Sequence, residues 1–258
     1  MLSIFLKRFS IPAISIVVFS ALLNVGFAHV SVGDDIPAER REGTYLYRFA
    51  MLQAGPGSML ELMNSLKKIG DSMTEEGEER PIIVQHHQGD HWDLLVIYPL
   101  DGHAPFRVTE ANGRRAEAVL AEIRPLLLWH EDLFVMGPEV DVLRGFLEGK
   151  GLVHFEMMQS LPGKFENLVE ERRMENTYNR LRGRGQTLIF THAAGAAWDV
   201  VTLGAYKDWY EYADSAKIPR EVSDKAARDA GFPSAAGVGL YMRTLISTHR
   251  DTLGPVIY

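Results

Sequence analysis

An internal repeat constrains the fold of this chain more than any other feature of its sequence. Residues 46–93 match residues 152–199 at a constant offset of 106 positions, without a gap. A later piece, 124–132, matches 243–251 at an offset of 119, so the second copy is 13 residues longer before its last segment. Repetition on this scale predicts two related units of one architecture. The identical residues of the two copies include Phe49/Phe155, His86/His192, Gly89/Gly195, Trp92/Trp198 and Asp93/Asp199.

Each copy has the pattern strand, helix, strand, strand, helix, strand. Alternating residues indicate the strands, and apolar residues at helical spacing indicate the helices. A two-residue turn at Gly89-Asp90 joins the second and third strands of the first copy into a hairpin. In the first copy the expected elements are a strand over 45–53, a helix over 59–73, strands over 82–87 and 91–98, a helix over about 114–130 and a short strand over 133–136.

This order is that of the ferredoxin-like βαββαβ motif. The strand that begins at Trp92 is apolar on both faces after Asp93, so both faces of its sheet need cover. The chain resembles the dimeric α+β barrel superfamily, which includes NIPSNAP-like proteins, EthD-like proteins and antibiotic-biosynthesis-type monooxygenases. The resemblance covers residues 45–258. It implies an α+β fold in which two tandem ferredoxin-like units pack sheet to sheet as a barrel within one chain, with ligands in the cleft between the sheets.

The first 28 residues are typical of a signal peptide. Lys7 and Arg8 precede a mostly apolar stretch, which ends in small residues at the −3 and −1 positions of a cleavage site after Ala28. The alternative is an uncleaved membrane anchor, because the apolar stretch is long enough to cross much of a bilayer. Cleavage predicts a periplasmic or secreted protein with no membrane contact. The expected domain boundaries are 1–28 for the signal peptide, 29–44 for a polar, solvated lead-in, 45–137 for the first unit, 138–150 for a linker and 151–258 for the second unit.

Composition excludes several classes of protein. A chain that is 46% hydrophobic and 24% charged is not disordered or fibrous. A formal net charge of −7 argues against a general nucleic-acid binder. The absence of cysteine excludes disulfides, thiol nucleophiles, thiolate zinc sites and cysteine-ligated iron–sulfur clusters. We expect a small-molecule ligand and a monomer, since the two sheets would cover each other.

The predicted hairpins place a histidine opposite an aspartate in each copy. A turn at Gly89-Asp90 sets His86 against Asp93, and the equivalent turn sets His192 against Asp199. The functional interpretation is a catalytic pair, in which a carboxylate orients an imidazole that moves protons. The structural interpretation is a latch that pins each hairpin beside a buried tryptophan.

The last helix of each copy carries a second set of candidate ligand-binding residues. His130 and His249 continue the apolar stripes of these helices, and aspartates follow two residues later. Each histidine is either a core residue or a member of a ligand pocket at the helix end. In the second case Arg124 and Arg243 are candidate anion-binding residues.

The first strand of each copy adds three more candidates. Arg48 in one copy, and His154 and Glu156 in the other, lie opposite the phenylalanine and methionine positions of the strand. If the phenylalanines and methionines pack under the helices, these polar groups face a ligand in the barrel. The alternative is a polar patch paired across the interface between the units.

Three further features receive weaker functional interpretations. The run 86–93 is rich in histidine, but only His86 and Asp93 have counterparts and no HExxH spacing occurs, so we expect no metal site there or elsewhere. The helix predicted over 164–184 alternates glutamate with arginine, which is typical of a solvated face. An aromatic group in the enlarged loop is either a lid or simple packing; its members are Tyr206, Trp209, Tyr210 and Tyr212.

These observations leave three functional hypotheses, and the cofactor stays open. The first is an exported small-ligand-binding or accessory protein with its pocket between the two sheets. The second is a cofactor-independent monooxygenase- or isomerase-type enzyme that uses the His–Asp pairs. The third, implied by the resemblance, is a haem-binding protein.

Overall fold

A computed structural model describes residues 36–100 and 118–257 of the chain. The fold is α+β, with one antiparallel sheet of eight strands. The strands are β1 (Tyr45–Ala54), β2 (Ile82–Gln85), β3 (Leu94–Leu100), β4 (Leu127–Gly137), β5 (Leu152–Ser160), β6 (Leu188–Gly195), β7 (Val200–Tyr206) and β8 (Ile246–Gly254).

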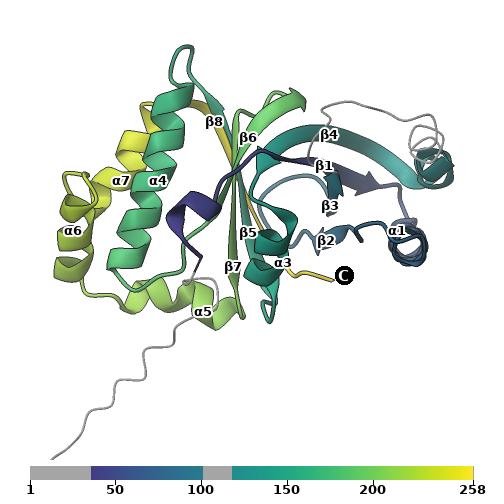
Figure 1. Ribbon diagram of the computed structural model, residues 1–258, viewed down its shortest axis with the longest axis horizontal. Helices are drawn as coiled ribbons and strands as arrows, with labels where there is room; N and C mark the ends of the chain where they lie inside the picture. The colour runs from purple at the N-terminus through teal and green to yellow at the C-terminus, as the bar shows by residue number, and fades with distance from the viewer. Residues whose placement is uncertain (1–35, 101–117, 258) are drawn as a thin grey trace, which may run out of the picture.

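The strand order is β2-β3-β1-β4-β6-β7-β5-β8. The first four and the last four strands each follow the ferredoxin-like order, and β4 pairs with β6 where the two sets meet. The outer ends also meet: isolated bridges join Val84 to Val256 and Gln88 to Leu253. These contacts, at the C-terminal end of β8, join the two outer strands and close the sheet into a barrel. Figure 1 shows the two halves of the sheet and the helices outside them.

The barrel interior is the main hydrophobic core, and its contents correct one expectation. Phe49 and Phe155 point inward, with ring centroids 5.7 Å apart, so they do not pack under the helices. Arg48, His154 and Glu156 consequently face the helices on the outside of the barrel. Alternation along a strand gives the period of its two faces but does not identify which face is internal, and both faces are buried here. Aromatic and aliphatic side chains fill the space in which a ligand cleft was expected.

Helices cover the outer face of each half of the sheet. Helix α1 (Met59–Glu75) packs on the first four strands, and α4 (Phe165–Leu181) packs on the last four (Figure 1). Three more helices belong to the helical layer of the second half: α5 (Trp209–Ala213), α6 (Arg220–Asp229) and α7 (Ala235–Arg243). The expectation that the charged residues of α4 are solvated holds for Glu166, Glu170, Arg173 and Arg180, but it is wrong for Glu171 and Arg172, which are buried.

The structure also replaces the ends of the two predicted helices with strands. Only residues 118–123 of the range 114–130 are described as α-helix, and a short 3-10 helix follows over Arg124–Leu126. Strand β4 then runs through His130, and β8 likewise runs through His249. Pro125 has no backbone N–H to continue an α-helix. The apolar run after Pro125 fits a strand as well as a helix, and pairing with β1 decides between them.

The segment taken as a linker is part of the core. It holds α3 (Val140–Leu147), whose Val142, Leu143 and Phe146 join the interior cluster. The lead-in is also less solvated than expected, since its 3-10 helix (Ala38–Arg40) is followed by a buried Arg41. The predicted signal peptide lies outside the described residues. Among the helices of residues 36–100 and 118–257, none has both the length and the apolar character that crossing a bilayer requires.

Candidate functional site

The predicted hairpin pairs form in the backbone but not between the side chains. The N–H of His86 donates to the carbonyl of Asp93, as the predicted register requires. The carboxylate of Asp93, however, accepts a hydrogen bond from the Ala54 N–H at 2.8 Å, and His86 Nε2 accepts one from the Asp90 N–H. No hydrogen bond joins the side chains of His86 and Asp93, both of which lie in the described part of the chain.

The second hairpin repeats this arrangement. The His192 N–H donates to the carbonyl of Asp199, while the His192 side chain is exposed. The Asp199 carboxylate accepts hydrogen bonds from both the N–H and the hydroxyl of Ser160, at 2.8 and 2.7 Å. Both aspartates thus anchor the end of the neighbouring strand, and the catalytic relay predicted at these hairpins is not formed.

The structure separates most of the other predicted ligand-binding residues. Arg124, His130 and Arg243 are exposed on the surface. Arg48 is half-buried against β4, where its guanidinium forms a two-point ion pair with Asp132, with N–O distances of 2.9 and 3.1 Å. These four residues do not form one site.

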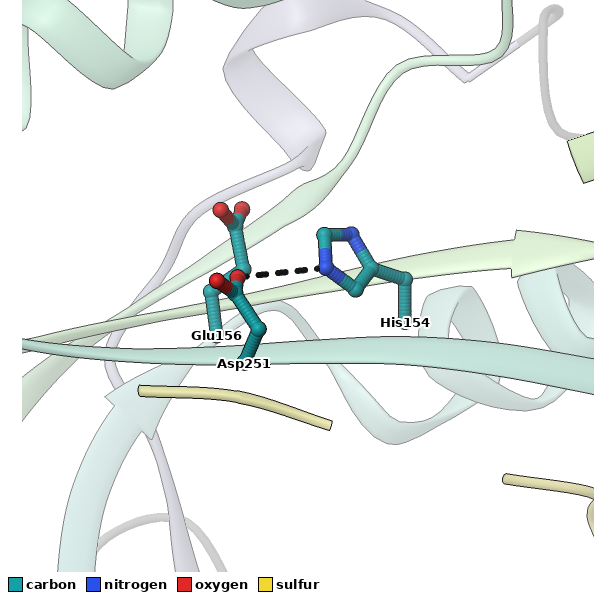
Figure 2. A group of neighbouring side chains, drawn as sticks. All are labelled: His154, Glu156 and Asp251. Atoms are coloured by element: carbon teal, nitrogen blue, oxygen red, sulfur yellow. Dashed lines mark ion pairs between the residues drawn. The ribbon is translucent and has the colours of Figure 1, made fainter. Parts of the chain in front are cut away.

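Three predicted residues do converge, and a fourth residue joins them. His154 and Glu156 on β5 lie beside His249 and Asp251 on β8, and we call these four residues the second-half cluster. Strand register explains the arrangement: Glu156 is paired with Asp251, and Met158 is paired with His249. Because alternate residues of a strand share one face, all four side chains lie on the helix-covered side. Figure 2 shows three members: His154, Glu156 and Asp251.

Short distances link the members of the cluster. His154 Nε2 lies 3.3 Å from Asp251 Oδ1. His249 Nε2 lies 3.3 Å from the same oxygen and 3.3 Å from Glu156 Oε1. The other oxygen of Glu156 accepts a 2.6 Å hydrogen bond from the hydroxyl of Thr202 on β7. The side chain of Asp251 is 50% exposed, so the cluster opens to solvent at this residue.

Helix α4 covers the cluster with buried charges. Arg172 forms ion pairs with Glu171 and with Glu175, the latter at 2.7 Å, and its guanidinium lies 3.7 Å from Glu156. Glu171 is fully buried, and its Oε1 has no hydrogen-bond partner among the described residues. Buried charges are expensive even when paired, so packing stability alone does not account for them.

The surroundings shift the pKa values of the cluster. Burial alone would lower the pKa of His154, but the hydrogen bond to Asp251 and the charge of Glu156 raise it above its usual value. Hydrogen bonds to Asp251 and Glu156 raise the pKa of His249 to about 9. Burial opposes ionisation of Glu156, yet His249, His154 and Arg172 lower its pKa to about 2. The cluster therefore holds a protonated His249 against the ionised carboxylates of Glu156 and Asp251 at neutral pH.

The enlarged loop of the second copy supplies an aromatic wall. The ring of Tyr212 lies edge-on to the imidazole of His154, with centroids 5.8 Å apart, and packs against Tyr206. Arg184 holds the loop by donating to the carbonyls of Glu211 and Tyr212. Of the predicted aromatic group, Tyr212 reaches the cluster, whereas Tyr210 is largely exposed.

Five members of this site were not predicted as site residues from the sequence: Asp251, Arg172, Glu171, Glu175 and Thr202. The repeat contained a signal that could have found several of them. Charged residues of the second copy replace apolar or small residues of the first at matched positions, and this contrast marks one face of α4 and β5. The replacements are Ala50 by Glu156, Ser65 by Glu171, Leu66 by Arg172 and Ile69 by Glu175.

Comparisons with known proteins show the fold and no family. No family model matches the sequence, and no curated protein matches it. An anthrone oxidase-like protein of known structure is similar with a TM-score of 0.55 and 10% identity, over 86% of this chain and 94% of that one. A mutant chlorite dismutase from Candidatus Nitrospira defluvii is similar with a TM-score of 0.51 and 9% identity, over 84% and 92%. These likenesses support a ferredoxin-like α+β fold.

The second-half cluster does not fit a haem group. An axial histidine needs a free ring nitrogen that faces an apolar slot wide enough for the macrocycle. The two part-buried imidazoles of the cluster instead direct Nε2 at carboxylates, beneath the charged face of α4. On the first half, Leu62, Leu66 and Ile69 fill the interval between helix and sheet.

Proposed function

We propose that this chain binds a small polar ligand at the second-half cluster, on the outer face of the barrel rather than between its two halves. One observation carries the proposal: the side chains at matched positions differ in chemical character between the two halves. At the matched positions of the first half, Arg48 pairs with Asp132 beneath the apolar face of α1. The second half has two histidines and two carboxylates beneath buried charges, and such perturbed groups concentrate at functional sites.

The geometry suits a small ligand with hydrogen-bonding groups. The cluster offers an imidazole, His154, between a carboxylate and the ring of Tyr212. Asp251 provides the entry from solvent. A polar ligand would exchange hydrogen bonds with this pair, and a flat part of the ligand would pack on the tyrosine ring.

We further propose that the chain is a fused pair of ferredoxin-like units with one working site, exported through its first 28 residues. The identical strand order and register of the two halves support fusion. The difference between the halves supports a single site, because a fused copy is free to lose a site that the other keeps. The export proposal depends on the sequence pattern alone.

A graft of first-half residues tests the proposed site. The variant Glu156→Ala, Glu171→Ser, Arg172→Leu and Glu175→Ile gives the second half the residues of the first. It should fold, because apolar replacement of a buried ion network is often neutral or stabilising. Ligand-observed NMR with a library of small polar metabolites should find binders of the wild type that do not bind the graft.

Arg173→Ala is the control for the graft, since Arg173 lies on the same helix with its side chain half-exposed, away from the cluster. This variant should keep every binder. Binders that are retained by a folded graft would place the ligand site elsewhere on the molecule.

A further inference from the structure

The second-half cluster has the donor atoms and the spacing of a divalent metal site. One ligand atom from each of His154, Glu156 and Asp251 lies within 4.8 Å of the other two (Figure 2). Donor atoms about 2.1 Å from a tetrahedral zinc ion lie about 3.4 Å from one another. The 3.3 Å between His154 Nε2 and Asp251 Oδ1 agrees with that spacing.

We propose that His154, Glu156 and Asp251 bind one divalent transition-metal ion, of the class to which Zn²⁺ belongs. This inference rests on the proposed function, because the metal would be the part of the site to which the polar ligand attaches. Three protein ligands leave a coordination position open, as in sites where zinc binds water or substrate. Imidazole nitrogen with carboxylate oxygen selects zinc and its neighbours over magnesium or calcium, which prefer all-oxygen sites.

The charges of the site suit a dication. Arg172 is neutralised mainly by the two glutamates of its own helix, since both lie nearer to its guanidinium than Glu156 does. Glu156 and Asp251 then supply two negative charges for the ion.

His249 and Thr202 would position the two carboxylates that bind the ion. His249 Nε2 lies 3.3 Å from an oxygen of each carboxylate, and the Thr202 hydroxyl donates to the second oxygen of Glu156. Hydrogen bonds to ligating carboxylates orient them and strengthen metal binding. The first half lacks this set, since Ala50 and Arg48 stand at the positions of Glu156 and His154. The proposal therefore requires one ion per chain.

The experiment is a titration of the full chain, stripped with EDTA, with Zn²⁺ by calorimetry and with Co²⁺ by visible absorption. We expect one ion per chain, with a Kd at or below roughly 10 μM. His154→Gln and Asp251→Asn should each weaken binding about 100-fold or more, and His249→Gln about tenfold. His87→Gln and Glu170→Gln remove an exposed imidazole and an exposed carboxylate, and they should leave the affinity unchanged.

Near-UV circular dichroism checks that each variant is folded. The proposal is overturned if the folded wild type binds neither ion, or if both His154→Gln and Asp251→Asn keep wild-type affinity. The small molecules found by NMR to bind the wild type distinguish the metal-site proposal from the small-ligand proposal. If the small-molecule binders still bind the EDTA-treated chain while Zn²⁺ does not, the small-ligand site is supported and the metal site is overturned. If neither the small molecules nor Zn²⁺ bind, both proposals are overturned.

Discussion

Asp199 holds Ser160 by two hydrogen bonds, whereas its counterpart Asp93 holds Ala54 by one. Both carboxylates fasten the end of a central strand to the hairpin beside it. This role is structural, and it accounts for the repeat of the aspartate in both copies without any catalytic function.

Alanine substitution of these aspartates should lower the free energy of unfolding by different amounts. Asp93→Ala should cost about 1.5–3 kcal/mol, the range for a hydrogen bond to a charged group. Asp199→Ala should cost more, because it also leaves the Ser160 hydroxyl without its acceptor. Urea denaturation measures both values. Equal losses, or a loss that Ser160→Ala does not reduce, would contradict the second hydrogen bond.

Glu171 should make the stability of the chain depend on pH. Burial raises the pKa of Glu171 from 4.5 to about 7, against the opposing charge of Arg172, while Glu175 and Glu156 add repulsion. The folded state therefore holds this proton more tightly, and the contribution is complete below about pH 4.5 and lost as the pH rises through 7. Relative to Glu171→Gln, the wild type should lose about 3 kcal/mol over this interval. Unfolding curves of the two proteins at pH 5 and pH 8 test this, and parallel changes would contradict it.

Adjacent arginines on α4 should respond very differently to substitution. Arg172→Met leaves the buried Glu171 and the part-buried Glu175 without their cation and should cost about 3–5 kcal/mol. Arg173→Met removes surface ion pairs with Glu42 and Glu170 and should cost about 1 kcal/mol or less. Thermal and urea unfolding give the comparison. Adding Glu171→Gln to Arg172→Met should restore part of the loss, since one buried charge then disappears.

The closed barrel should make the full chain a monomer and its halves unstable. Phe49 and Phe155 pack on each other across the interior, so either half alone would expose an apolar sheet face. Light scattering should give the mass of one chain, 28.9 kDa before any cleavage. A fragment of residues 44–137 that folds cooperatively and stays monomeric would contradict this packing.

Processing of the N-terminus stays a prediction from sequence. Cleavage after Ala28 should give a mature protein that begins at His29 and is released by osmotic shock or found in the medium. Edman sequencing or intact mass of the purified protein measures the terminus. An intact Met1 in the membrane fraction would instead indicate the anchor.

The element order and the hairpin register could be predicted from sequence because they depend on local spacing. The fold class follows from the same spacing, and the backbone pairing of His86 with Asp93 is as predicted. Which face of each strand points into the barrel could not be predicted, because a strand that is buried on both faces has no polar face to mark the outside. His130 and His249 were assigned to helices because a continuous apolar run fits both periods.

The candidate site was predicted in part. His154, Glu156 and His249 were named, but from separate elements and for separate reasons. Their convergence on Asp251 depends on β8 pairing with β5, a contact between residues far apart in the sequence. The burial of Arg172 depends on the same packing, because an alternation of glutamate and arginine looks identical on a solvated helix.

Closure of the barrel sets the order in which the chain can fold. Strand β2, in the first third of the sequence, obtains its outer partner only in residues 253–257. The outer edge of β2 therefore stays without its partner until residues 253–257 have been synthesised, and the ring closes only after them. Contacts of such long sequence separation slow folding, since the intervening chain must be ordered before they form. Removal of residues 255–257 would take away the bridge from Val84 to Val256 and the backbone hydrogen bonds of Gln85 and Ile83 across the seam, while leaving the pairing of β5 with β8 in place.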